Sequence, residues 1–220
     1  MKILLSFILV ICNLATIAQQ KEPETHSEWK LSKEKEGIKI FTRWRPVEED
    51  REARELRGEM IVDVPVSNII HLIKDDKKAT EWINRVKVFK NVRIVDDFTW
   101  YSYSEMAIPW PMDNQDMVTK NELKIYKNGK VEVVLSGASE QVPVKDGIRR
   151  IEHFEGGWKM EPLHNGNIKI TYSMYNNSKP VIPRLITDPL VFNSFWSTLD
   201  DMRKILVKNK DKVVELPYLK

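Results

Sequence analysis

One short segment carries the side chains best suited to hold the polar end of a ligand. Residues 100–107 read Trp-Tyr-Ser-Tyr-Ser-Glu-Met-Ala, the period-two pattern that is typical of a strand. Tyr101, Tyr103 and Glu105 share one face of this strand, and Trp100 lies on the other. If the tyrosine face points inward, it offers two hydroxyls and one carboxylate to a bound molecule. The sequence does not choose the face, so the opposite arrangement, with Trp100 buried, stays open.

A buried Glu105 would need a cationic partner, because a buried charge is costly when it is alone. Arg149 and Arg150, on a later expected strand, are the candidates for this partner. We take Arg150 as the candidate that lies in the site.

The chain shows no catalytic or metal-binding pattern. Its four histidines (His26, His71, His153 and His164) have neither an i, i+4 pair nor a zinc-type spacing. Residues 137–141 lack the second glycine of a nucleophile elbow, and no glycine-rich phosphate loop is present. We therefore expect no enzymatic activity, no metal and no cofactor.

The N-terminus has the pattern of a cleaved secretory signal over residues 1–18. Lys2 is followed by an apolar run at residues 3–14 and by Thr-Ile-Ala at residues 16–18. The run is short for a bilayer span, which needs about 20 residues, although a retained anchor is the alternative. Cys12 is the single cysteine, so the mature chain would have none. We expect an exported protein, periplasmic or extracellular, whose fold rests on its apolar core without disulfides.

The charges of the chain are balanced and interleaved. There are 35 basic and 32 acidic residues, so removal of Lys2 with the signal leaves a net charge of +2. Charges of both signs are interleaved, as at residues 33–36 and 48–52, which is typical of a solvated surface and disfavours nucleic-acid binding. No repeat or linker divides the rest, so we predict one domain at residues 19–208, a tail at 209–220, and a monomer.

The expected elements belong to the α+β class. Strand patterns occur at residues 37–44, 54–64, 86–95, 99–107, 117–126, 130–135, 149–154 and 167–175, and helical spacing at 66–73, near 79–83 and at 183–208. Ser67 or Asn68 is available near the first N-cap. Asn128-Gly129 and Asn165-Gly166 predict type I′ hairpin turns, hence an antiparallel meander.

The last helix carries a bulky apolar stripe that includes Phe192, Phe195, Trp196, Leu199 and Met202. Such a stripe either packs as a filled core or lines an empty space against a curved sheet. Pro189 follows Asp188 near its start, and we expect a kink or a break there.

Several local patterns resemble one family, the START (steroidogenic acute regulatory protein-related lipid transfer) domains. The most specific is Pro-Trp-Pro-Met-Asp-Asn-Gln-Asp-Met-Val at residues 109–118, and Gly156-Gly157-Trp158 and Glu81-Trp82 resemble further family segments. The matches run in order over roughly residues 27–207. Gln115 stands where the family commonly has Arg, and Met117 replaces a frequent aromatic.

The resemblance implies a helix-grip fold, in which a curved antiparallel sheet wraps around the long C-terminal helix and a deep cavity lies beneath that helix. It implies binding or transfer of a sterol, phospholipid, sphingolipid or similar hydrophobic molecule. A helix-grip enzyme, such as a cyclase or hydrolase, and a ligand-sensing interaction protein are the alternatives. Separately, Trp110 beside an Asn- and Asp-rich loop suggests transient contact with a membrane surface, with a place in the packed core as the alternative. The predicted ligand-binding residues are Trp82, Tyr101, Tyr103, Glu105, Trp110, Arg150, Trp158, Phe192, Phe195, Trp196, Leu199 and Met202.

Overall fold

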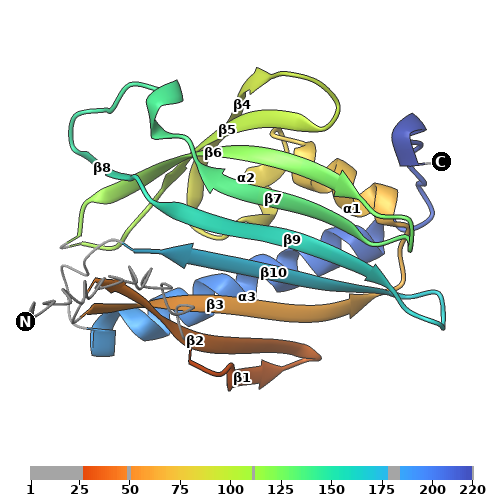
Figure 1. Cartoon of the computed structure of the whole chain (residues 1–220), viewed down its shortest axis with the longest axis horizontal. Helices are drawn as coiled ribbons and strands as arrows, with labels where there is room; N and C mark the ends of the chain where they lie inside the picture. The colour runs from red at the N-terminus through yellow and green to blue at the C-terminus, as the bar shows by residue number, and fades with distance from the viewer. Residues whose placement is uncertain (1–26, 49–50, 111, 178–183, 220) are drawn as a thin grey trace, which may run out of the picture.

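Ten strands form one curved sheet, and a long C-terminal helix lies along its concave face (Figure 1). The computed structural model describes residues 27–48, 51–110, 112–177 and 184–219. The strands are β1 (Lys30–Lys35), β2 (Ile38–Glu48), β3 (Arg51–Val62), β4 (Val86–Ile94), β5 (Thr99–Met106), β6 (Asn114–Ile125), β7 (Val131–Gly137), β8 (Ile148–Ile151), β9 (Phe154–Pro162) and β10 (Ile168–Asn176). The helices are α1 (Val66–Lys74), α2 (Ala79–Trp82) and α3 (Arg184–Lys208), with two 3₁₀ turns, η1 (Ser139–Gln141) and η2 (Pro217–Leu219). The predicted α+β architecture is confirmed.

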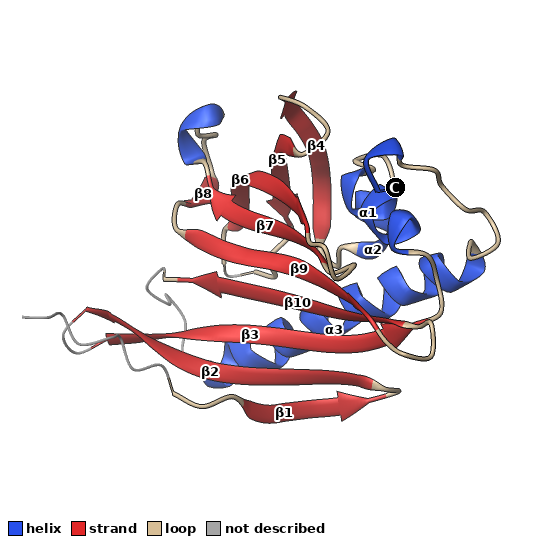
Figure 2. Ribbon diagram, turned by 45° about the vertical axis from the view of Figure 1, so that its right-hand side comes forward, coloured by secondary structure: helices blue, strands red, loops and turns tan. Residues whose placement is uncertain are grey.

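The strand order explains how the sheet curls. Along the path β1-β2-β3-β10-β9-β7-β6-β5-β4 all neighbours are antiparallel, and β8 pairs in parallel with β6. After β3 the chain crosses through α1 and α2 to the far edge and then returns strand by strand until β10 pairs with β3. Figure 2 shows the strongly curved sheet and the position of α3 against it.

The helix packs closely on the sheet at Gly58, in the middle of β3. A Cβ atom at this position would lie 2.8 Å from Cε1 of Phe195 and would also overlap Cδ1 of Leu199. On the same face of β3, Leu56 and Met60 are buried in the core. The alternation of the strand and the missing side chain at Gly58 together allow α3 to pack directly on the sheet.

The two Asn-Gly hairpin turns differ from the predicted type. Gly129 has a φ of 79° and Gly166 a φ of 85°, whereas the preceding asparagines are not in the left-handed region. Instead, Asn128 Oδ1 accepts a hydrogen bond from the Lys130 amide (3.1 Å), so its side chain closes the turn while its backbone keeps an ordinary φ. Within the described ranges, two successive positive φ angles, as a type I′ turn requires, occur at Glu36-Gly37 between β1 and β2.

Three further local predictions are corrected. The predicted strand at 149–154 is two elements, β8 and the start of β9, and the remainder of β9 was not expected from alternation. Helix α3 is continuous across Pro189, so of the expected kink or break, the break is not there. Neither Ser67 nor Asn68 caps α1; Asn68 Oδ1 instead accepts a hydrogen bond from the Val214 amide (2.9 Å).

The segment after α3 packs against the body of the domain. Leu216, Tyr218 and Leu219 contact the main core, and the Tyr218 ring lies 5.2 Å from the Phe98 ring. Among the residues that the structure describes, no helix is both long and apolar enough to cross a membrane. The predicted signal at residues 1–18 lies outside the described residues and stays a prediction.

Candidate functional site

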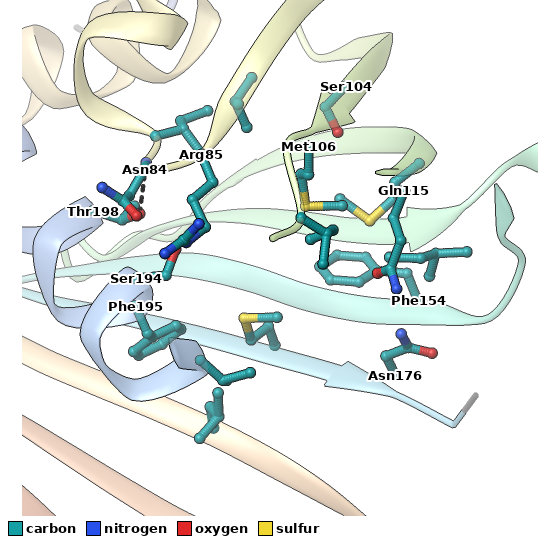
Figure 3. Close-up of a pocket in the computed structure, with 18 of the residues that line it drawn as sticks. Asn84, Arg85, Ser104, Met106, Gln115, Phe154, Asn176, Ser194, Phe195 and Thr198 are labelled. Atoms are coloured by element: carbon teal, nitrogen blue, oxygen red, sulfur yellow. Dashed lines mark hydrogen bonds between the residues drawn. The ribbon is translucent and has the colours of Figure 1, made fainter. Parts of the chain in front are cut away.

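A cavity of about 530 Å³ lies between the inner face of the sheet and the first half of α3 (Figure 3). Strands β3 to β10, the segment that joins α2 to β4, and the first half of α3 all contribute side chains to its wall. The volume is within the range of about 300–1,000 Å³ that is usual for small-molecule sites. Most of the wall is apolar, so the space favours a hydrophobic molecule.

A row of aromatic rings forms one side of the cavity. Trp82 meets Trp158 edge to face, with ring centroids 5.6 Å apart. Trp158 stacks on Tyr172 at 3.9 Å, and Tyr172 stacks on Phe195 of α3 at 5.1 Å. These stacked rings link α2, the sheet and α3 into one rigid wall.

The phenol of Tyr172 is a neutral group inside this wall. Burial raises its pKa to about 12. The hydroxyl makes no hydrogen bond with any described residue, although part of the side chain is accessible. Because Tyr172 lines the cavity, its hydroxyl is free to bond a molecule held there.

Polar side chains on β5 and β6 satisfy one another on the opposite side. Asn121 Nδ2 donates to Ser102 Oγ (3.0 Å), and Ser102 Oγ donates to Asn91 Oδ1 (3.0 Å). Ser104 and Thr119, also in the cavity wall, are buried beside them. Paired groups of this kind cost little to bury, so the network is compatible with a mainly apolar guest.

Two polar contacts tie the beginning and the middle of α3 to their surroundings. The Asn84 amide donates to Thr198 Oγ1 (3.1 Å), as Figure 3 shows. Nearer the start of the helix, Arg54 Nη1 of β3 bonds Asp188 Oδ2 (2.5 Å). Both contacts lie at the cavity wall, so they hold in place the part of α3 that covers the cavity.

Three of the predicted ligand-binding residues line the cavity, namely Trp82, Trp158 and Phe195. The other nine do not: Tyr101, Tyr103, Glu105, Trp110, Arg150, Phe192, Trp196, Leu199 and Met202. Contact of any of these residues with a ligand stays a prediction.

The orientation of β5 explains why Tyr101, Tyr103 and Glu105 lie outside the cavity wall. Ser102, Ser104 and Met106 face the cavity, so the tyrosines and the glutamate point to the other face of the sheet. There Tyr103 is buried under the turn after β7, and its hydroxyl donates to Glu105 Oε2 (3.3 Å). Of the two arrangements that the sequence leaves open, the structure therefore has the one in which Trp100 is buried.

The predicted pairing of Glu105 with an arginine is wrong. Lys145 Nζ lies 3.3 Å from Glu105 Oε2. Arg150 is paired with Asp116 through Nε (2.6 Å) and Nη2 (2.9 Å), and it also donates to the carbonyls of Ser139, Val142 and Pro143 at 3.0, 2.9 and 3.2 Å. The hydrogen bond to Asp116 raises the pKa of Arg150. All five guanidinium N–H groups have an acceptor, so Arg150 is a structural anchor on the outer face.

The four α3 residues outside the cavity wall occupy different environments. Phe192 lies under the Arg54 guanidinium (4.8 Å), and Trp196 Nε1 donates to the Lys35 carbonyl (3.3 Å). Leu199 and Met202 are fully buried in the filled core. Trp110 is 91% exposed in the segment that follows β5.

Several cavity residues had no sequence signal. The inward serines of β5 and Asn121 could have been found only if the face of that strand were known. Arg85, just before β4, belongs to no motif, yet its side chain lies in the cavity (Figure 3). Within the described ranges, no group of three or more histidine, cysteine or acidic side chains is placed to hold a metal ion.

The model of the START domain family matches residues 11–212. This chain belongs to the START domain family. The finding confirms the resemblance and, with the curved sheet around α3, the helix-grip fold of this START domain.

Known proteins that resemble this START domain include lipid transfer proteins. The crystal structure of a STAR-related lipid transfer protein fragment from Xanthomonas axonopodis is 26% identical, covers 81% of this chain and 98% of that one, and has a TM-score of 0.71. Human StAR-related lipid transfer protein 5 shares the fold at 19% identity, covering 82% and 86%, with a TM-score of 0.68. An uncharacterized Pseudomonas aeruginosa protein, PA1579, is 24% identical over 181 residues, which are 82% of this chain and 88% of that protein.

The same fold also occurs in an enzyme. The Zhui aromatase/cyclase from Streptomyces has a TM-score of 0.52 at 8% identity, covering 71% of this START domain and 95% of the enzyme. This likeness concerns the fold alone.

Proposed function

We propose that this START domain holds one lipid-sized hydrophobic molecule in its cavity and carries it without changing it chemically. The observation that supports this most directly is the apolar space of about 530 Å³ between the sheet and α3. The START family and its lipid transfer members support the same reading.

The driving force would be the transfer of apolar surface out of water. At roughly 25 cal/mol per Å², a lipid that buries on the order of 400 Å² gains about 10 kcal/mol. The lost freedom of the guest offsets a sizeable part of this gain. A wall that stays in contact with the guest on all sides therefore binds it best.

The first half of α3 would act as the lid. It is joined to the sheet by the Arg54–Asp188 pair, and just beyond it the Asn84–Thr198 hydrogen bond joins the middle of α3 to the α2–β4 junction; both are polar contacts that can break and re-form. Release of the guest would require these contacts to open while the second half of α3 stays packed in the core.

Trp110 would bring the open cavity to a membrane. Its ring is 91% exposed, while its neighbours Ile108, Pro109 and Met112 line the cavity. An amphipathic ring of this kind partitions to the membrane interface. We expect Trp110→Ser to reduce co-sedimentation with phosphatidylcholine vesicles several-fold, and equal co-sedimentation would remove Trp110 from the proposal.

Export and a monomeric state complete the proposal. The signal pattern at residues 1–18 predicts delivery to the periplasm or the exterior. Expression with and without these residues, followed by fractionation of the cells, tests this part.

A helix-grip enzyme is the second candidate, because the fold occurs in an aromatase/cyclase and because Tyr172 and Arg85 both line the cavity. The chemistry of the site favours binding. Tyr172, with a pKa of about 12, is far from the range in which a general acid or base works well at neutral pH. None of the described cavity-lining residues is a histidine.

Native mass spectrometry of residues 19–220 tests the proposal. We expect a fraction of the purified protein to carry one adduct of lipid size that is lost on denaturation. A protein that carries no adduct and takes up no fluorescent lipid would contradict it, and turnover of an added polyketide or ester would favour the enzyme. A loaded protein that does not pass its lipid to vesicles would indicate a sensor.

A further inference from the structure

Arg85 has an unusual backbone conformation. Its φ is 66°, in the left-handed region that glycine and asparagine tolerate and that bulky side chains rarely adopt. The hydrogen bond from the Ala107 amide to the Arg85 carbonyl (2.8 Å), and that from the Val86 amide to the Ile83 carbonyl (3.2 Å), hold the chain in this turn. Such a conformation is a cost that the surrounding structure imposes, and it often marks a position with a function.

The conformation directs the side chain into the cavity. Figure 3 shows the guanidinium group of Arg85 reaching toward Ser194 on α3. Neither the guanidinium group nor the Ser194 hydroxyl makes a hydrogen bond or an ion pair with any described residue. Arg85 also remains accessible, so a guest in the cavity can reach it.

Several other arginines of the molecule have a partner within the protein. Arg150 has an acceptor for each of its five N–H groups, and Arg54 in the cavity wall is paired with Asp188. Arg51, also in the wall, donates to the Asn177 carbonyl (2.6 Å). Arg85 is an exposed cation at the cavity wall, and no described residue pairs with it, so its guanidinium group is available to an anionic guest.

We propose that Arg85, with Ser194, binds the oxyanion head of the guest, and hence that the guest is an anionic single-chain amphiphile with a carboxylate or a phosphate. This inference rests on the proposed function and specifies its ligand. The size of the cavity agrees with one chain: at about 30 Å³ for each water-sized group, it holds on the order of 20 non-hydrogen atoms. The guanidinium fork and the hydroxyl then form charge-assisted hydrogen bonds to the head, while the aromatic row contacts the chain.

The test compares a charged and a neutral form of one chain. Residues 19–220 are titrated at pH 7.5 with cis-parinaric acid and with its methyl ester, and the dissociation constants are read from the fluorescence of the polyene. We expect the wild type to bind the acid at least tenfold more tightly than the ester. Arg85→Gln should raise the dissociation constant of the acid at least tenfold and leave that of the ester within twofold. Arg85→Lys should keep part of the preference for the acid.

The matched control is Arg93→Gln. Arg93 is an exposed cation on β4 that lies outside the cavity wall, and its guanidinium bonds Gln141 (3.5 Å). Loss of this charge should change neither dissociation constant. An equal effect of Arg93→Gln and Arg85→Gln on the acid would show a general effect of net charge and would overturn the proposal.

A second variant separates recognition from folding. Arg85→Gly relieves the left-handed strain, so we expect its melting temperature to stay the same or to rise by about 2 °C while the preference for the acid is lost. A fall in melting temperature together with an unchanged preference would make Arg85 a structural residue.

Competition between amphiphiles with different head groups identifies the head group that Arg85 prefers. Dodecanoate, dodecyl phosphate and dodecanol are each used to displace cis-parinaric acid, and the more potent anion gives the head chemistry. If neither anion displaces the probe better than dodecanol, or if folded Arg85→Gln binds the acid like the wild type, the inference fails. Failure of the wild type to bind both the acid and the ester would instead refute the proposed function.

Discussion

The two halves of α3 carry the same kind of apolar stripe but face different surroundings. In the second half, Leu199, Met202 and Leu206 are fully buried against the filled core. In the first half, Val191 and Ser194 are only partly buried, and both border the cavity. One half therefore anchors the helix, and the other half covers the space that we assign to the guest.

The difference shows that an apolar stripe on a helix indicates which face is buried. It does not indicate whether side chains or an empty cavity lie opposite that face. Residues of α1, β2 and β3 pack directly on the helix and belong to its core cluster. The sheet lines the cavity with the aromatic rings of Trp158 and Tyr172 on β9 and β10, but with the small side chains Ser102 and Ser104 on β5. Large residues opposite the stripe give a solid core, whereas small residues on a sheet that curves away leave room.

Leu199→Ala should have the largest effect on stability. It removes a fully buried side chain from the filled half of the interface, and we expect the free energy of unfolding to fall by about 2–5 kcal/mol. Leu190→Ala, in the cavity wall, should cost less than about 1 kcal/mol because its side chain already lacks neighbours on one side. Urea unfolding of both variants measures the difference, and equal losses would contradict the division of the helix.

Gly58→Ala should weaken the anchored half by a smaller amount. The new Cβ would overlap Leu199 and lie 2.8 Å from Phe195, so α3 or both side chains must shift. We expect a loss of about 1–3 kcal/mol in the free energy of unfolding. Gly166→Ala is a useful comparison: a Cβ meets nothing there, so a similar loss would come from its φ of 85° alone. A Gly58→Ala protein as stable as the wild type would show that the close contact is not required.

Asp200→Asn should lower the stability less than Leu199→Ala or Gly58→Ala, and its effect should depend on pH. Burial pushes the pKa of Asp200 upward, but hydrogen bonds from Lys204 (2.7 Å) and Arg203 (2.5 Å) outweigh it, so the pKa is lowered. A lowered pKa in the folded state means that the ionised carboxylate stabilises the fold above the unfolded pKa of about 3.9, and that this stability is lost as the pH falls through the folded value.

We therefore expect Asp200→Asn to lower the free energy of unfolding by about 1 kcal/mol at pH 7. Denaturant titrations between pH 2 and pH 7 should show the two proteins converge at the acidic end. A difference that stays constant over this range would mean that the charge of Asp200 is not the cause.

Much of the fold could be predicted because its signals are local. Alternation located β3 and β5, and the spacing of apolar residues located α1 and α3 to within one or two residues. Strand β1 was not expected, because its residues are mostly charged and exposed at the sheet edge. Strand β9 was obscured by Gly156-Gly157, yet these glycines are needed there: a Cβ at Gly157 would lie 2.7 Å from the Val133 carbonyl.

The site could be predicted only in part because its geometry is not local. Trp82, Trp158 and Phe195 were found from the family patterns and the stripe. The inward face of β5 depends on how the whole sheet curls, and both faces of that strand carry polar and apolar residues. Arg85 is defined by its backbone angle, which no composition or spacing indicates.

The most direct test of the proposed binding site is to fill the cavity with a large side chain from the first half of α3. Ser194→Trp places a large side chain in the wall of the cavity, whereas Asn193→Trp places the same side chain on the exposed face of the same helix. Uptake of the methyl ester of cis-parinaric acid, a neutral probe that does not depend on Arg85, is measured for both variants after circular dichroism has shown that they are folded. We predict at least a tenfold loss of affinity for Ser194→Trp and none for Asn193→Trp. Equal affinity in the two variants would contradict the claim that the guest lies between the sheet and the first half of α3.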